Sequence, residues 1–153
     1  MSVHGKMEVE LEVKVSAAQF HEVVSFRPHH ISNMTPDHLQ GVDLHEGEWG
    51  KQGKVISFNY VHDGVPKVAK DRLEVIDDVN YLSSYRVIDG DPLKEYKDLL
   101  VTVQATPKGD GSLVKWTFEY EKLNPDVPDP QSLLDYVVTV SKGIDDHHTT
   151  TAN

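Results

Sequence analysis

Cysteine, long apolar segments and an excess of positive charge are all missing from this chain of 153 residues. Without cysteine the chain has no disulfides, thiolate metal sites or cysteine nucleophiles, so its stability must come from its core. No apolar run approaches the ~20 residues that span a bilayer, and the start of the sequence, 1–6, has no apolar segment typical of a secretory signal. These absences predict a cytoplasmic protein with no integral membrane association.

Positive charge is scarce, with 15 Lys and Arg residues against 25 Asp and Glu and a formal net charge of −10. A field of that sign repels a phosphate backbone, whose neutralisation normally supplies most of the affinity for nucleic acid. Nucleic acid is therefore not an expected partner, and the acidic surface is typical of a protein that stays in solution.

The first third of the chain begins with strict alternation, since residues 7–15 carry apolar side chains at every odd position and charges at every even one. This period of two predicts a strand with one buried face. Ser16 and Gln19 resemble a helix capping box, which predicts a short helix that ends near Pro28. A second short helical turn is expected at 30–33.

Short alternating segments bounded by glycine, proline, aspartate and asparagine fill the middle of the chain and predict a meander of hairpins. The six expected strands are 39–44, 55–61, 65–76, 81–88, 96–106 and 113–121. After the proline-rich connector 124–130, apolar residues recur every three or four positions and predict an amphipathic helix. Asp129 suits its N-cap, with Pro130 as its first residue.

These elements predict one α+β domain over residues 1–153: a seven-stranded curved antiparallel sheet wrapped around a long C-terminal helix, with two short helices after strand 1. The dry face of this sheet is rich in aromatic side chains, and a curved sheet can stand away from its covering helix. An empty void of about 300 Å³ would cost about 7 kcal/mol, so a cavity there would hold water or a ligand. The residues alone leave two interpretations open, a solid aromatic core and a ligand cavity.

Seven segments, in order along nearly the whole chain, carry a family resemblance. They read RPHHISNM at 27–34, QGVDLHEGEWG at 40–50, NYVHDG at 59–64, PKVAK at 66–70, EYK at 95–97, GSLVKWT at 111–117 and YEKLN at 120–124. Together they resemble the major latex protein branch of the Bet v 1 / PR-10 superfamily of plants. The resemblance implies the same arrangement of strands and helices and a hydrophobic cavity between the sheet and the C-terminal helix.

The resemblance also implies a function, the binding of lipids, steroids, hormones, flavonoids or alkaloids in plant defence and stress responses. The chain departs from the family at Gly143, where relatives usually carry an acidic residue. A glycine inside a helix costs ~1 kcal/mol relative to alanine, so we expect the helix to fray or end there.

Strand alternation and helical spacing, taken with the resemblance, predict the cavity wall and a non-covalent hydrophobic ligand as the partner. The expected ligand-binding residues are Phe58, Tyr60, Tyr85, Val101, Val103, Trp116, Phe118, Tyr136, Val137 and Val140. No catalytic residue, cofactor or metal is expected, and the protein is expected to act as a monomer or weak dimer.

Two enzymatic functions remain as alternatives. Tyr85, Tyr96 and Lys97 are polar groups on or near strands that could face the cavity, and some superfamily members use such groups for proton transfer in alkaloid condensation or isomerisation. Ribonuclease activity, sometimes attributed to PR-10 proteins, is the weaker alternative. The glycine-bearing loop 47–53 leads into a strand and lacks Gly-Lys-Ser/Thr, so it does not predict a nucleotide site. The nine histidines do not predict a metal site, because no His-Glu-x-x-His spacing occurs.

Overall fold

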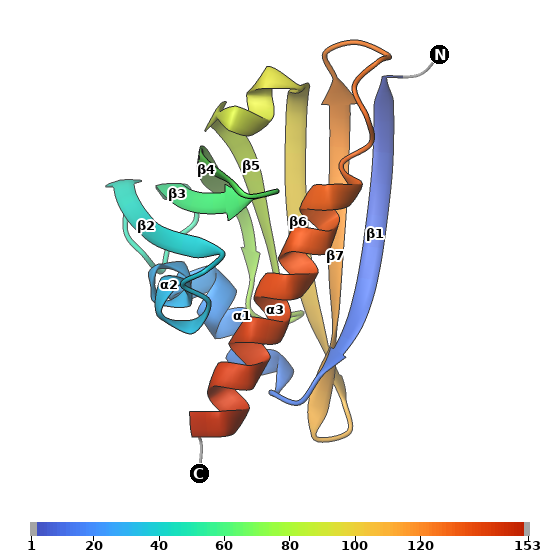
Figure 1. Ribbon diagram of the computed structural model, residues 1–153. Coiled ribbons are helices and arrows are strands. Elements are labelled where there is room, and N and C mark those ends of the chain that lie inside the picture. Colours follow the sequence, from blue (N-terminus) through green and yellow to red (C-terminus); the bar gives the residue numbers. More distant parts are fainter. Residues whose placement is uncertain (1–2, 152–153) are drawn as a thin grey trace.

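The computed structural model describes residues 3–151, so both ends of the predicted domain, 1–2 and 152–153, lie outside the described residues. Figure 1 shows a sheet that bends around one long helix, with short helices at one end. The elements are β1 (His4–Val13), α1 (Ala17–Phe26), η1 (Pro28–His30), α2 (Ile31–Met34), β2 (Leu39–Glu46), β3 (Val55–His62), β4 (Val65–Asp77), β5 (Leu82–Gly90), η2 (Asp91–Lys94), β6 (Tyr96–Lys108), β7 (Gly111–Lys122) and α3 (Gln131–Thr151).

The seven strands form one antiparallel sheet in the order β1-β7-β6-β5-β4-β3-β2. Strands β2 to β7 are neighbours in both sequence and space, and β1 adds to the far edge beside β7. The predicted α+β fold is confirmed: a curved antiparallel sheet, two short helices after β1 and a long C-terminal helix.

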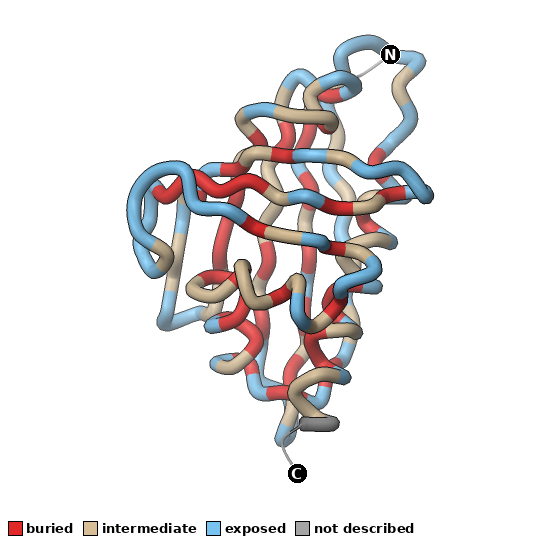
Figure 2. The backbone as a smooth tube through the Cα atoms, turned by 60° about the vertical axis from the view of Figure 1, so that its left-hand side comes forward, coloured by how far each residue is buried: buried red, intermediate tan, exposed pale blue. Residues whose placement is uncertain are grey.

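The concave face of the sheet holds the core, and α3 lies across it (Figure 1). In β7 the inward residues Val114, Trp116, Phe118 and Tyr120 are all buried, while the residues between them are partly or fully exposed. Figure 2 shows the same alternation of buried and exposed positions along the strands. The period of two in the sequence therefore corresponds to one apolar face that packs toward α3.

The C-terminal part of α3 is fixed to the start of the chain by polar contacts. The Asp145 carboxylate accepts hydrogen bonds from the backbone N–H groups of Lys14 and Val15, each at 3.0 Å. One turn earlier in α3, Ser141 Oγ accepts a hydrogen bond from Trp116 Nε1 of β7 at 2.9 Å. These contacts hold α3 against both β1 and β7.

The prediction that α3 frays or ends at Gly143 is wrong, because the helix continues to Thr151. A Cβ atom at Gly143 would lie 2.5 Å from Thr35 Cγ2, just after α2, so only glycine allows this close approach. The contacts of Asp145 and this packing outweigh the low helix propensity of one glycine.

The start of α3 differs by one residue from its prediction. The helix begins at Gln131, and Pro130 precedes it, with its carbonyl accepting the Leu134 N–H at 3.0 Å. The Asp129 carboxylate accepts a hydrogen bond from the Tyr120 hydroxyl at 2.6 Å and lies 3.0 Å from the Lys122 amine. Asp129 thus fixes the segment 124–130 to β7.

Candidate ligand-binding cavity

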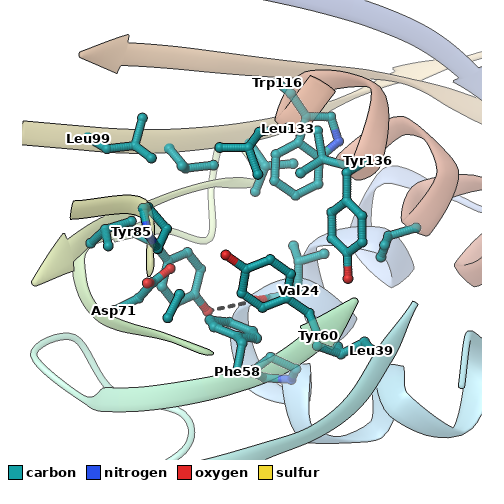
Figure 3. Close-up of a pocket in the computed structure, with 18 of the residues that line it drawn as sticks. Val24, Leu39, Phe58, Tyr60, Asp71, Tyr85, Leu99, Trp116, Leu133 and Tyr136 are labelled. Atoms are coloured by element: carbon teal, nitrogen blue, oxygen red, sulfur yellow. Dashed lines mark hydrogen bonds between the residues drawn. The ribbon is translucent and has the colours of Figure 1, made fainter. Parts of the chain in front are cut away.

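A cavity of about 170 Å³ lies between the concave face of the sheet and α3. Strands β3 to β7 supply most of the wall, α3 closes it, and α1, η1 and α2 contribute at one end. Figure 3 shows aromatic and aliphatic side chains pointing into the same space from both layers. The wall is almost entirely apolar, as expected of a site that takes a hydrophobic molecule.

All ten residues predicted from the sequence lie in this wall. Strand alternation places those of β3, β5, β6 and β7 on the concave face, and Tyr136, Val137 and Val140 lie on the face of α3 that covers it. The wall contains ten further residues that were not predicted: Val24, Pro28, Ile31, Leu39, Ala69, Asp71, Val87, Pro92, Leu99 and Leu133.

The volume sets the size of an occupant. A water molecule takes about 30 Å³ of liquid volume, so 170 Å³ is room for several waters or for one small organic ring. An engineered apolar cavity of ~150 Å³ is known to bind benzene. The interpretation as a solid aromatic core is therefore wrong for this part of the structure.

Three tyrosines reach the cavity, and two of their hydroxyls are already bonded to backbone. The Tyr85 hydroxyl donates to the Val24 carbonyl at 2.7 Å (Figure 3), and the Tyr136 hydroxyl donates to the His38 carbonyl at 2.5 Å. Burial raises the pKa of both phenols above the ordinary value, so both stay neutral near pH 7. They help to fix the wall and have no spare donor for a guest.

Tyr60, on β3, is different because its hydroxyl makes no hydrogen bond to a described residue. Its ring lies 5.7 Å from that of Tyr136, and its hydroxyl points into the cavity in Figure 3. Burial, followed by the nearby carboxylates of Asp91 and Asp71, raises the pKa of Tyr60. A neutral, unpartnered phenol in this position can donate a hydrogen bond to a guest.

Asp71, on β4, is the one carboxylate among the described wall residues. It lies on the inward face between Ala69 and Leu73, and its side chain is buried. Its Oδ1 atom has no hydrogen-bond partner among the described residues. Burial raises the pKa of this carboxyl to about 7, because the charged form is poorly solvated there.

Lys54 is fully buried just before β3 and holds the glycine-bearing loop 47–53. Its Nζ donates to the carbonyls of Ser25 in α1 and Trp49 in the loop, both at 2.6 Å. Desolvation lowers the pKa of this amine to about 8. Lys54 lies outside the cavity wall, so its role is to fasten the loop to α1.

The three groups considered for catalysis do not come together. Tyr85 lies in the cavity wall, but the Tyr96 hydroxyl donates to the Pro128 carbonyl at 2.7 Å in a smaller recess that adjoins the cavity. The Lys97 side chain is 70% exposed and lies 3.5 Å from Glu121. The expectation that Tyr96 and Lys97 face the cavity is wrong.

A curved antiparallel sheet that grips a long helix around an apolar cavity defines the helix-grip class of proteins. The family model described as Pathogenesis-related protein Bet v 1 family matches residues 2–150, and the chain belongs to that family. It is 51% identical over 148 residues to MLP-like protein 31 of Arabidopsis thaliana, which covers 95% of this chain and 86% of the relative. Two further Arabidopsis relatives are longer, and the chain spans 45% and 44% of their lengths. The predicted resemblance to the major latex proteins is confirmed.

Solved structures agree with this assignment. Ginseng major latex-like protein 151 from Panax ginseng superposes with a TM-score of 0.93 at 39% identity, over 96% of this chain and 99% of that one. A norcoclaurine synthase from Thalictrum flavum, in complex with dopamine and hydroxybenzaldehyde, superposes with a TM-score of 0.73 at 21% identity, over 95% of this chain and 89% of that one. The second likeness shows the shared fold alone. No helix within residues 3–151 has the length and hydropathy of a membrane span.

Proposed function

We propose that this protein binds and carries one small hydrophobic molecule without covalent chemistry, in plant defence or stress responses. The observation that carries the proposal is the apolar cavity of about 170 Å³ between the sheet and α3. If this space were dry and empty, it would cost about 4 kcal/mol at ~24 cal/mol per Å³, a large part of the ~5–15 kcal/mol by which domains are stable. An apolar guest removes that cost and buries its own surface at ~25 cal/mol per Å².

Membership of the Bet v 1 family supports the proposal, because its members generally bind hydrophobic ligands. Residues of a single chain line the cavity from both the sheet and α3. The proposal accordingly includes a single domain, no cofactor, and action in the cytoplasm as a monomer or weak dimer.

Most of the polar groups near the cavity are held by the protein itself, which favours a carrier over an enzyme. Proton transfer in a condensation needs an acid and a base that both reach the substrate. Here Tyr85 and Tyr136 are bonded to backbone carbonyls, and Lys54 is held outside the cavity wall by two carbonyls. Tyr60 and Asp71 remain free to reach a guest, and a turnover assay tests whether they transfer protons to it.

The experiment is to purify the protein, extract it with organic solvent and analyse the extract by mass spectrometry, and to assay turnover of dopamine with hydroxybenzaldehyde in parallel. The proposal predicts release of an intact hydrophobic compound and no turnover. Catalytic consumption that disappears in Tyr60→Phe or Asp71→Asn would support an enzyme instead, and RNA cleavage that persists through further purification would support a ribonuclease.

A further inference from the structure

Asp71 occupies a position where the strand pattern calls for an apolar side chain. Its neighbours along the inward face of β4 are Ala69 and Leu73, and its partners across the sheet are Ile56 of β3 and Val87 of β5. All four are apolar and buried in the hydrophobic core. An aspartate enclosed in this way is destabilising unless a partner satisfies it.

The protein supplies no such partner for Oδ1 among the described residues. The other cavity hydroxyls do not reach it, since those of Tyr85 and Tyr136 donate to the carbonyls of Val24 and His38. The Asp71 side chain is only 8% exposed and lines the cavity. The missing partner of its unpaired oxygen therefore has to come from the cavity itself.

The Tyr60 hydroxyl provides a hydrogen-bond donor that complements the acceptor Asp71. It points into the cavity toward the side on which Asp71 lies (Figure 3), and no hydrogen bond joins the two residues. Asp71 accepts hydrogen bonds when ionised, and a neutral phenol donates one. A hydroxyl group placed between them would donate to Asp71 and accept from Tyr60, whereas an ammonium would use only Asp71.

We propose that Asp71 is a specificity-determining residue of the cavity, which accepts a hydrogen bond from a hydroxyl group on an otherwise apolar ligand and rejects ligands that carry a carboxylate. This inference rests on the proposed carrier function and names its ligand class, a small apolar alcohol or phenol. A site with a buried polar group discriminates strongly against an analogue that leaves that group unpaired. A carboxylate ligand would add a second negative charge beside Asp71 in a poorly solvated space.

Three probes of matched size test the proposal: 4-ethylphenol, 4-ethylanisole, in which a methyl group replaces the hydroxyl proton, and 4-ethylbenzoate. Each has one ring, which suits a cavity of about 170 Å³. Titration calorimetry at pH 8 keeps the phenol neutral, because phenols ionise near pH ~10, and keeps Asp71 mostly ionised, because its pKa is about 7. The wild-type protein should bind 4-ethylphenol at least tenfold more tightly than 4-ethylanisole, and 4-ethylbenzoate at least tenfold more weakly than 4-ethylanisole.

Two variants at position 71 assign the selection to this residue. In Asp71→Leu the preference for the phenol over the anisole should fall below threefold. In Asp71→Asn, which keeps the shape and removes the charge, affinity for 4-ethylbenzoate should rise at least tenfold, and this variant carries the test if Asp71→Leu does not fold. Tyr60→Phe separates the two polar groups, because it should weaken the phenol about threefold and leave 4-ethylbenzoate the weakest of the three ligands.

The outcomes separate this inference from the carrier function. Equal affinities for phenol and anisole in the wild type, or unchanged rejection of 4-ethylbenzoate in Asp71→Asn, would overturn the role of Asp71 while the carrier function stands. Failure of all three probes to bind would overturn both.

Discussion

Filling the cavity from the sheet side should stabilise the empty protein, and Ala69 is the position for this substitution. Its side chain lies on the inward face of β4 and lines the cavity. Ala69→Leu adds three carbon atoms, and burying them contributes roughly 2.4 kcal/mol of stability at ~0.8 kcal/mol per methylene. Because the added atoms enter existing space, we expect the free energy of unfolding to rise by about 1–2 kcal/mol.

Ala105 provides the matched control. It is 1% exposed on the inward face of β6 but does not line the cavity. The same three carbons at Ala105 must displace packed neighbours, so Ala105→Leu should lose about 1–3 kcal/mol of stability. Any change in strand propensity is the same for both substitutions.

Urea denaturation of ligand-stripped protein, followed by circular dichroism, measures both effects, and an unchanged m-value shows that the comparison is sound. Titration with 4-ethylanisole adds a second readout, since Ala69→Leu should weaken binding more than tenfold. A loss of 1 kcal/mol or more in Ala69→Leu, similar to that of Ala105→Leu, would show that the cavity does not exist in solution.

Three further predictions test individual residues. For Asp71, the unfolded chain loses its proton near pH 3.8 and the folded protein keeps it until about pH 7, so this residue lowers stability progressively as pH rises between those values. In urea titrations, the free energy of unfolding of the wild type minus that of Asp71→Asn should therefore fall by roughly 4 kcal/mol from pH 3.8 to pH 7. A difference that does not change with pH would contradict the raised pKa. Lys54→Met leaves one buried and one partly buried carbonyl unpaired, so we expect a loss of about 1–3 kcal/mol and faster trypsin cleavage at Lys51. Unchanged stability and cleavage would refute the fastening role. Gly143→Ala should destabilise the protein despite its better helix propensity. Adding Thr35→Ser, which removes the crowding methyl group, should restore most of the loss. A Gly143→Ala protein that is more stable than the wild type would contradict the contact.

The sheet could be predicted from the sequence because its signals are local. Alternation in β7 and the turn residues between strands are visible within ten or so residues, and the long helix shows its own spacing. The boundaries were less exact: β6 extends to Lys108, two residues past the predicted end, because the turn needs only the glycine at 109, with φ of 58°, to reverse the chain.

The cavity wall was predicted only where one strand or helix determines which way a side chain points. Val24 and Ile31 line the wall because α1, η1 and α2 pack at one end of the cavity, and no local pattern in the sequence indicates this packing. The contact between Thr35 and Gly143 joins positions more than a hundred residues apart, so it too has no local signal.

Asp71 was missed for a different reason, because a signal for it was present. The alternation of Ala69, Asp71 and Leu73 places the aspartate on the inward face of a predicted strand. A charged residue in such a pattern is normally assigned to the outer face, and the buried exception marks the part of the wall with polar chemistry.

The volume of the cavity depends on the distance between sheet and helix, which no single segment determines.

Native mass spectrometry of the freshly purified protein tests the central claim most directly. The carrier account predicts a population heavier than the bare chain by one small organic molecule, and this adduct should disappear when the protein is unfolded in acid and solvent. After that molecule is removed and the protein refolded, added 4-ethylphenol should restore a one-to-one complex. A spectrum that shows only the bare chain both before and after addition of 4-ethylphenol would contradict the account.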